Sequence, residues 1–279
     1  MLYVARNNQL LSGDNGCIRV WNLVNGDCER KIFAHNWIVL NLVALNGVYK
    51  DINHFTFVSN DFNTIKVWHL DTEQCLYSIK DEIEKSFFNC LIALPEISLN
   101  RNAKRTNNDN DVIQIYSSKQ IYVATGSDDG LIRVWDMSQR KCLRRLKMGF
   151  DRTPISSLVY LTNTNELISA TCLHMGGSVH VWNVMRGECI KSLVAGACES
   201  LHILPNTGHL VTGGMDGSIK VWLLMSNCPK QRNKFNFMLP HHQHYILKEH
   251  DATVNGLEFY SKEMLTVGQD GEDFFIVIE

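Results

Sequence analysis

A short apolar pattern ending in tryptophan recurs along this chain of 279 residues, and it restricts the possible folds more than any other feature. The pattern is CIRVW at its first occurrence and SIKVW at its fifth. Its tryptophans are Trp21, Trp68, Trp135, Trp182 and Trp222, at successive intervals of 47, 67, 47 and 40 residues. A sixth copy aligns on the last residues, with Ile276 at the tryptophan position. Repetition at this spacing predicts an array of one supersecondary unit.

Each repeated unit is predicted to be a sheet of four antiparallel strands. In the third unit, the apolar runs 121–125 and 131–135 flank the turn GSDDG, and Asp-Gly between such runs predicts a hairpin. An inner strand is expected before each hairpin. An outer strand is expected to begin at the cysteine that follows four of the tryptophans by seven residues: Cys28, Cys75, Cys142 and Cys189.

Both faces of such a sheet carry apolar residues, so the sheet has to pack between two neighbours. Radial packing of four-stranded sheets is the β-propeller solution, and we predict an all-β propeller in a single domain, with six blades visible. The expected blades are approximately 1–33, 36–80, 86–147, 152–194, 198–248 and 252–279. Two polar insertions are expected, at 98–117 in the third blade and at 225–244 in the fifth.

The two ends of the sequence leave the closure of the ring open, and closure is expected to be incomplete. Residues 1–6 are long enough for only one strand, and the chain stops just after the third strand of the sixth blade. Either residues 1–6 also close the ring, or the sixth blade keeps an unpaired edge, or the chain is a piece of a longer propeller with six or seven blades. An unpaired edge would invite a partner strand.

These repeats resemble the WD-repeat (WD40) β-propeller family over nearly the whole chain, although the Trp-Asp pair itself occurs once, at Trp135-Asp136. The resemblance implies a buried hydrogen-bond network of a histidine, a serine or threonine, a turn aspartate and the tryptophan. In the second blade, Phe62 stands where the aspartate is expected, so no blade has all four members. Besides the tryptophans, the implied members are His35, His250, Asp129, Asp216 and Asp270, and we expect their role to be structural.

The composition excludes several classes of protein. The net charge is −2 and 45% of residues are hydrophobic, which suits a soluble globular protein better than a dedicated nucleic-acid binder. No apolar run reaches the roughly 18 residues that span a bilayer. The start of the chain lacks the pattern of a signal peptide. Nine scattered cysteines without a CxxC pair argue against a disulfide framework, so we expect the reducing environment of the cytoplasm or nucleus.

Neither metal binding nor catalysis is expected, and no cofactor is predicted. The repeated cysteines should lie one per blade, too far apart to share a metal ion, and are expected to be small buried hydrophobes. The cluster 241–244 (HHQH) is the other metal candidate, and a polar loop is the preferred interpretation. The chain contains no HExxH, GxSxG, P-loop or GxGxxG motif, and turns account for its repeated glycines and aspartates.

The sequence therefore predicts a non-enzymatic protein-interaction scaffold, an adaptor that assembles a multiprotein complex. In the resembling family, partners most often bind the face built from the hairpin turns and from the loops before the inner strands. Trp37 lies in such a loop, either exposed as an interface residue or packed against the first blade. The residues predicted to form this rim are Asp14, Asn36, Trp37, Asp61, Asp128, Arg152, Met175, Glu199, Met215, Asp251 and Gln269.

Two alternatives remain open at this point. One is a substrate-recognition subunit of a ubiquitin ligase, because the outer strands loosely resemble those of propellers in such ligases. The other is binding of anionic lipid or nucleic acid through basic loops on the opposite face. The basic residues of these loops are Arg101, Lys104, Arg105, Lys230, Arg232 and Lys234.

Overall fold

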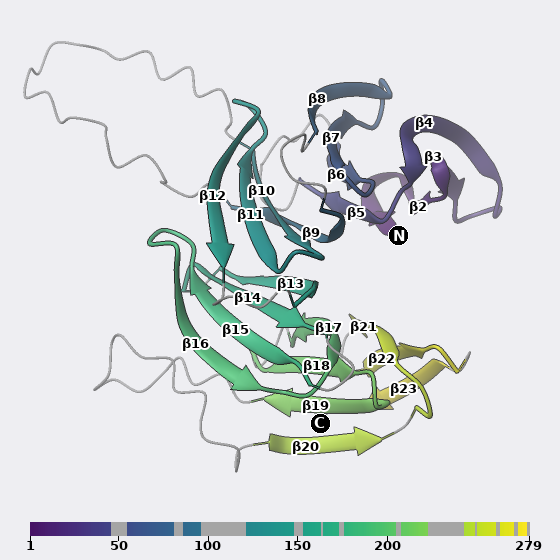
Figure 1. Cartoon of the computed structure of the whole chain (residues 1–279). Coiled ribbons are helices and arrows are strands. Elements are labelled where there is room, and N and C mark those ends of the chain that lie inside the picture. The colour runs from purple at the N-terminus through teal and green to yellow at the C-terminus, as the bar shows by residue number, and fades with distance from the viewer. Residues whose placement is uncertain are drawn as a thin grey trace, which may run out of the picture. The chain divides into compact units, whose positions relative to one another are not determined.

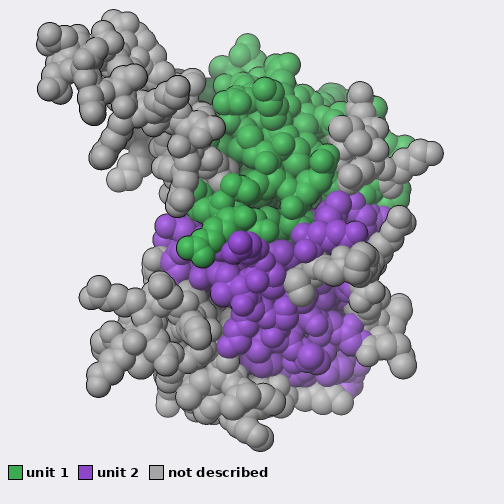
Figure 2. All heavy atoms as spheres, turned by 60° about the vertical axis from the view of Figure 1, so that its left-hand side comes forward, with its two compact units in different colours: residues 1–125, 132–146, 184–187 green, residues 126–131, 147–183, 188–279 purple. Residues whose placement is uncertain are grey.

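The computed structural model describes residues 1–45, 55–80, 86–95, 121–147, 153–162, 164–172, 176–204, 208–222, 243–248, 250–260, 263–270 and 273–277. Apart from the 3₁₀ turn η1 (Ala5–Asn7), the regular structure of these residues consists of strands (Figure 1). The chain divides into two compact units, which Figure 2 colours separately. Unit 1 comprises residues 1–125, 132–146 and 184–187, and unit 2 comprises 126–131, 147–183 and 188–279. The single-domain division remains a prediction.

Unit 1 contains three antiparallel sheets, apart from the hairpin tip 126–131. Their strands follow one another in sequence order across each sheet. They are β1-β2-β3-β4 (Leu2–Val4, Gln9–Gly13, Asn15–Asn22, Cys28–Ile38), β5-β6-β7-β8 (Asn41–Ala44, Thr56–Asn60, Thr64–His69, Gln74–Lys80) and β9-β10-β11-β12 (Phe88–Leu94, Tyr122–Ser127, Leu131–Asp136, Lys141–Lys147).

Unit 2 contains the other three sheets, the last of which has three strands among the described residues. They are β13-β14-β15-β16 (Ile155–Leu161, Glu166–Thr171, Ser178–Asn183, Glu188–Val194), β17-β18-β19-β20 (Cys198–Ile203, Leu210–Gly214, Ser218–Trp222, Gln243–Lys248) and β21-β22-β23 (Val254–Tyr260, Glu263–Gly268, Asp273–Val277). The prediction of an all-β fold built from four-stranded antiparallel blades is confirmed.

The second strand is buried on both faces in the third, fourth and fifth sheets, which explains its continuous apolar sequence. Every residue of β10, β14 and β18 is buried. Outer strands such as β12 and β16 instead alternate between buried or half-buried and exposed residues, with lysine and arginine at several exposed positions. A sheet with this distribution cannot stand alone in water, because both faces of its inner part are apolar.

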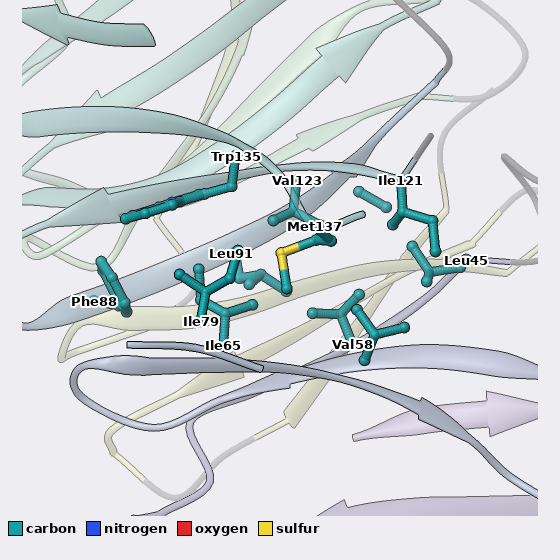
Figure 3. Close-up of a cluster of buried hydrophobic side chains, with 12 residues drawn as sticks. Leu45, Val58, Ile65, Ile79, Phe88, Leu91, Ile121, Val123, Trp135 and Met137 are labelled. Carbon is teal, nitrogen blue, oxygen red and sulfur yellow. The ribbon is translucent and has the colours of Figure 1, made fainter. Parts of the chain in front are cut away.

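The hydrophobic core is divided into clusters that lie between neighbouring sheets within each unit. One cluster joins the second and third sheets, and Figure 3 shows residues from both, such as Val58, Ile65, Phe88 and Trp135, meeting there. Another joins the first and second sheets around Phe57, which is fully buried. In unit 2, separate clusters join the fourth with the fifth sheet and the fifth with the sixth. Each sheet is therefore stabilised mainly by its neighbours along the chain.

The described strands place the start of the chain in the first sheet. β1 pairs with β2, so residues 2–4 form the inner strand of that sheet. How the ring closes remains a prediction.

Candidate protein-interaction site

The tryptophan of each repeat is fixed by a hydroxyl on the neighbouring strand. In the five sheets with a repeat tryptophan, the indole Nε1–H donates to a serine or threonine hydroxyl on the preceding strand. The pairs are Trp21–Ser12 at 2.8 Å, Trp68–Ser59 at 2.8 Å, Trp135–Thr125 at 2.9 Å, Trp182–Ser169 at 2.9 Å and Trp222–Thr212 at 3.0 Å. Ser12, Ser59 and Ser169 were not predicted as partners from the sequence.

The second sheet contains all four members of the network, so the assignment of Phe62 to the aspartate position is wrong. Trp68 donates to the Ser59 Oγ, which lies 2.7 Å from His35 Nε2. His35 Nδ1 in turn faces Asp61 Oδ2 at 3.4 Å. Counted back from the tryptophan, Ser59 lies nine residues earlier, rather than ten as in the third and fifth sheets, and Asp61 lies seven residues earlier, rather than six. An alignment anchored on the tryptophan therefore passes over Asp61.

The electrostatics of this network keep His35 neutral. The pKa of His35 is lowered to about 4, mainly by burial and with a contribution from Lys66, while Asp61 acts in the opposite direction. A neutral imidazole that accepts the Ser59 hydroxyl proton at Nε2 carries its own proton on Nδ1, toward Asp61. Nδ1 has no hydrogen-bond partner within the described part of the chain, and its contact with Asp61 Oδ2 is longer than a typical hydrogen bond. Asp61 instead uses Oδ1 to accept the backbone N–H groups of Asn63 and Thr64, at 3.1 and 2.7 Å.

The order Ser59–His35–Asp61 is that of a hydrolase triad, but the site cannot perform that chemistry as it stands. Ser59 is fully buried, and its oxygen already accepts the Trp68 indole proton. A nucleophile has to reach the substrate and be hydrogen-bonded to its base at the same time. The buried arrangement is consistent with a structural network.

The sixth sheet holds a second histidine network. His250 Nδ1 lies 3.0 and 3.1 Å from the two carboxylate oxygens of Asp270, and Nε2 lies 2.8 Å from the Thr266 hydroxyl. Ile276 pairs with Met264 just as Trp68 pairs with Phe57, so it occupies the tryptophan position in the register.

The remaining turn aspartates hold their own hairpins. Asp129 accepts the Leu131 N–H at 3.0 Å, and Asp216 accepts the N–H and hydroxyl of Ser218 at 3.1 and 2.5 Å. Asp14 forms an ion pair with Arg19, 2.9 Å between Oδ2 and Nη2, and this hydrogen bond lowers the pKa of the Asp14 carboxyl.

The repeated cysteines differ from the prediction of small buried residues. Cys28 and Cys75 are exposed, and Cys142 and Cys189 are half-buried. Each thiol donates to the carbonyl oxygen two residues later, at 3.3 to 3.5 Å. In the first, second and fourth sheets the cysteine faces the tryptophan at a β-bulge of the outer strand. A small side chain with a weak donor suits this irregular backbone.

The structure places most of the predicted rim residues at the surface and one of them inside. In unit 1, Asp14 and Asn36 are exposed, whereas Asp61 is 2% exposed and does not present its carboxylate to a partner. In unit 2, Asp251 and Gln269 are exposed, and Asp128, Glu199 and Met215 are partly exposed. Arg152 and Met175 lie outside the described residues. So do the basic residues Arg101, Lys104, Arg105, Lys230, Arg232 and Lys234, and His241 and His242 of the histidine cluster.

Trp37 is 61% exposed, which decides between the two alternatives for its side chain. Its ring contacts Phe62 in the hairpin turn of the second sheet, with the ring centroids 6.4 Å apart. Phe62 also contacts Phe87, which precedes the third sheet, at 5.2 Å. Trp37, Phe62 and Phe87 thus form a continuous aromatic row, which the sequence analysis did not foresee beyond Trp37.

Within the described ranges, no three histidine, cysteine, aspartate or glutamate residues gather as metal ligands. No helix in those ranges has the length and apolarity needed to cross a membrane.

The sheets and their tryptophan networks define the class of protein, a β-propeller built from four-stranded repeats. A profile described as "WD domain, G-beta repeat" matches residues 105–136 and 187–222. The chain therefore contains repeats of the WD40 type at these positions and resembles the WD40-repeat proteins, a family that is in general not enzymatic.

The solved and curated proteins support the same class. The crystal structure of the computationally designed Ika8 protein matches with a TM-score of 0.59 and 24% identity, over 97% of this chain and 68% of the other. Human apoptotic protease-activating factor 1 is 24% identical over 218 residues, 75% of this chain and 15% of that protein. A striatin homolog of Dictyostelium discoideum is 24% identical over 258 residues, 75% of this chain and 30% of that protein. The WD repeat-containing protein pop2 of Schizosaccharomyces pombe is 23% identical over 207 residues, 69% and 27%. The chain thus spans less than a third of each of these three relatives.

Proposed function

We propose that this chain is a non-enzymatic protein-interaction scaffold, an adaptor that helps to assemble a multiprotein complex in the cytoplasm or nucleus. The observation that carries the proposal is the exposure of Trp37, near the end of β4, and of Phe87, just before β9. Large exposed aromatic side chains are enriched at the centres of protein interfaces, where they supply much of the binding energy.

The placement of the polar side chains supports the same proposal. The serine, histidine and aspartate groups that could perform chemistry in the second sheet are buried among themselves and their tryptophan. The predicted rim, in contrast, has exposed or partly exposed side chains that a partner protein could contact. The proposed binding residues are Asp14, Asn36 and Trp37 in unit 1, and Asp128, Glu199, Met215, Asp251 and Gln269 in unit 2.

Affinity purification of the tagged full-length chain from cells, followed by mass spectrometry, tests this function. We expect a defined set of proteins that is enriched over the tag alone and withstands added nuclease and 0.5 M salt (roughly the range in which phosphate-driven binding weakens steeply). Enrichment of nucleic acid or anionic lipid, abolished by salt, would instead support the alternative through the basic loops. No enriched protein at all would overturn the scaffold proposal.

The purification also separates the adaptor from a ubiquitin-ligase subunit. An adaptor should retain stable, stoichiometric partners. A substrate-recognition subunit should co-purify with ligase components and hold further proteins whose abundance rises when the chain is depleted.

A further inference from the structure

We propose that the aromatic row formed by Trp37, Phe62 and Phe87 binds an extended, uncharged peptide segment of another protein, with bulky apolar side chains at positions i and i+2. This inference rests on the proposed function and names the partner chemistry of one part of the rim.

The backbone holds the row in a fixed arrangement. The loop after Trp37 is tied to the hairpins of the first and second sheets, because Val39 N–H donates to Asp14 O at 3.1 Å and Leu40 N–H donates to Asn60 O at 2.9 Å. The Phe62 carbonyl accepts the N–H of Phe88, next to Phe87, at 2.7 Å. Three loops from three consecutive sheets of unit 1 are thereby linked, so binding costs little loop ordering.

The spacing of the rings suits an extended chain. Successive ring centroids lie 6.4 and 5.2 Å apart. An extended peptide rises about 3.3 Å per residue and presents alternate side chains on one face, roughly 6.6 Å apart. Two side chains at i and i+2 therefore match the intervals of the row. Neighbouring rings contact each other edge to face, so they do not form an aromatic cage that could enclose one ligand group.

The surroundings favour an uncharged partner. The described neighbours of the three rings in the sequence are Asn36, Ile38, Asp61, Asn63, Ser86 and Phe88, and the aspartate is buried. Arg19, the cation at the Asp14 end, is already paired with that carboxylate at 2.9 Å. A phosphorylated or acidic segment needs converging free cations, and the described part of the row offers none.

The size of the patch favours a segment over a second folded copy. Trp37 is 61%, Phe87 52%, Ile38 47% and Leu40 38% exposed. Together with the partly exposed Phe62, these side chains offer on the order of 400 Å², about half of what each partner buries in a standard interface. That area fits a short segment with two or three anchoring side chains.

A random dodecapeptide phage library, selected on the immobilised full-length chain, tests the inference. We expect enriched sequences with bulky apolar residues at i and i+2 and few charges between them. Synthetic peptides of the enriched sequences should bind in fluorescence polarisation, and Trp37→Ala or Phe87→Ala should weaken binding about tenfold or more each.

Phe33→Ala is the matched control, because Phe33 is 80% exposed on β4 yet is not part of the row. It should leave the affinity unchanged. Thermal melts of all three variants check that they remain folded. Trp37→Gln provides a second substitution at position 37, in case Trp37→Ala fails to fold. Enrichment of acidic sequences, absence of any enriched sequence, or affinities indifferent to Trp37 and Phe87 would overturn the inference. Self-association that Trp37→Ala abolishes would overturn it in favour of a second copy.

The two proposals fail separately. If the Trp37→Ala, Phe87→Ala double variant still purifies the same cellular proteins, the scaffold proposal stands and the row is not its binding site. If the wild-type chain purifies no protein, the scaffold proposal itself fails.

Discussion

In each repeat with a tryptophan, the serine or threonine on the preceding strand is the residue that fixes the ring. Its hydroxyl accepts the indole N–H, which needs an acceptor when the tryptophan is buried. In the second sheet the same oxygen continues the chain of hydrogen bonds to His35, so one serine joins the tryptophan of β7 to β4. Lys66 reinforces this link by donating from Nζ to the Ala34 carbonyl in β4 at 2.6 Å, and Lys220 likewise donates to the carbonyl of Ala195, just after β16, at 2.8 Å.

His35 should make the stability of the protein depend on pH. Its folded pKa of about 4 lies below the ordinary value of 6.5. Above pH 6.5 the residue is neutral in both states and has no effect. As the pH falls from 6.5 to 4, only the unfolded state takes up the proton, so the free energy of unfolding decreases by up to roughly 3 kcal/mol. Urea unfolding at pH 7.5 and pH 4.5 measures this loss.

His35→Asn is the comparison for that measurement. The variant should be less stable than wild type at pH 7.5, since the Ser59 hydroxyl loses its acceptor, but the difference between the two proteins should shrink toward pH 4.5. A constant difference across this range would show that His35 is not the titrating group.

Single residues also show where sequence reasoning reached its limit. The tryptophans and the partners Thr125 and Thr212 could be predicted, because their hairpins share one length. Ser59 and Asp61 were missed, since Ser59 lies one residue closer to its tryptophan, and Asp61 one residue farther from it, than their counterparts in the third and fifth sheets. A signal was present: Ser-x-Asp occurs nine residues before the tryptophan at both 12–14 and 59–61. Contacts across chain elements, such as those of Phe62 with Trp37 and Phe87, depend on how loops from three sheets meet, and no spacing encodes them.

Among the structural elements, the hairpin turns pack closely against the backbone that precedes the next sheet. Gly16 in β3 has a φ of +66°, and a Cβ there would lie 2.6 Å from the carbonyl oxygen of His35 in β4. Gly217 in the fifth sheet has a φ of +76° and approaches the His250 carbonyl in the same way. The hairpin glycine therefore packs against this backbone, a reason for the residue beyond the turn itself.

Gly16→Ala should destabilise the protein more than Gly26→Ala. Both glycines have a positive φ, +66° and +77°, so both substitutions carry the conformational cost of roughly 1–2 kcal/mol. A Cβ at Gly26 would meet nothing within 4 Å, whereas at Gly16 it would collide with backbone. Urea denaturation of the two variants should show the larger loss for Gly16→Ala. Equal losses would mean that the contact with the His35 backbone relaxes without cost.

For the whole molecule, stability is distributed over clusters between neighbouring sheets. The aromatic row of Trp37, Phe62 and Phe87 is adjacent in sequence to one of these clusters. Phe87 and Phe88 are adjacent, yet Phe87 is 52% exposed in the aromatic row and Phe88 is fully buried against Trp135, with 6.0 Å between ring centroids. Successive side chains at the start of β9 point to opposite environments. Phe87 is therefore available for the proposed binding, whereas its neighbour Phe88 stabilises the fold.

The pair Phe87 and Phe88 therefore allows binding and stability to be separated within one molecule. Phe88→Ala removes a ring from the cluster of Figure 3 and should cost about 3–5 kcal/mol. Since each sheet depends on its neighbours, hydrogen exchange should accelerate in β5–β7 and β9–β11 while β17–β19 keep their protection. Phe87→Ala should leave exchange in all these strands nearly unchanged and weaken only peptide binding. Uniform acceleration across both units after Phe88→Ala would show instead that the sheets unfold as one cooperative body.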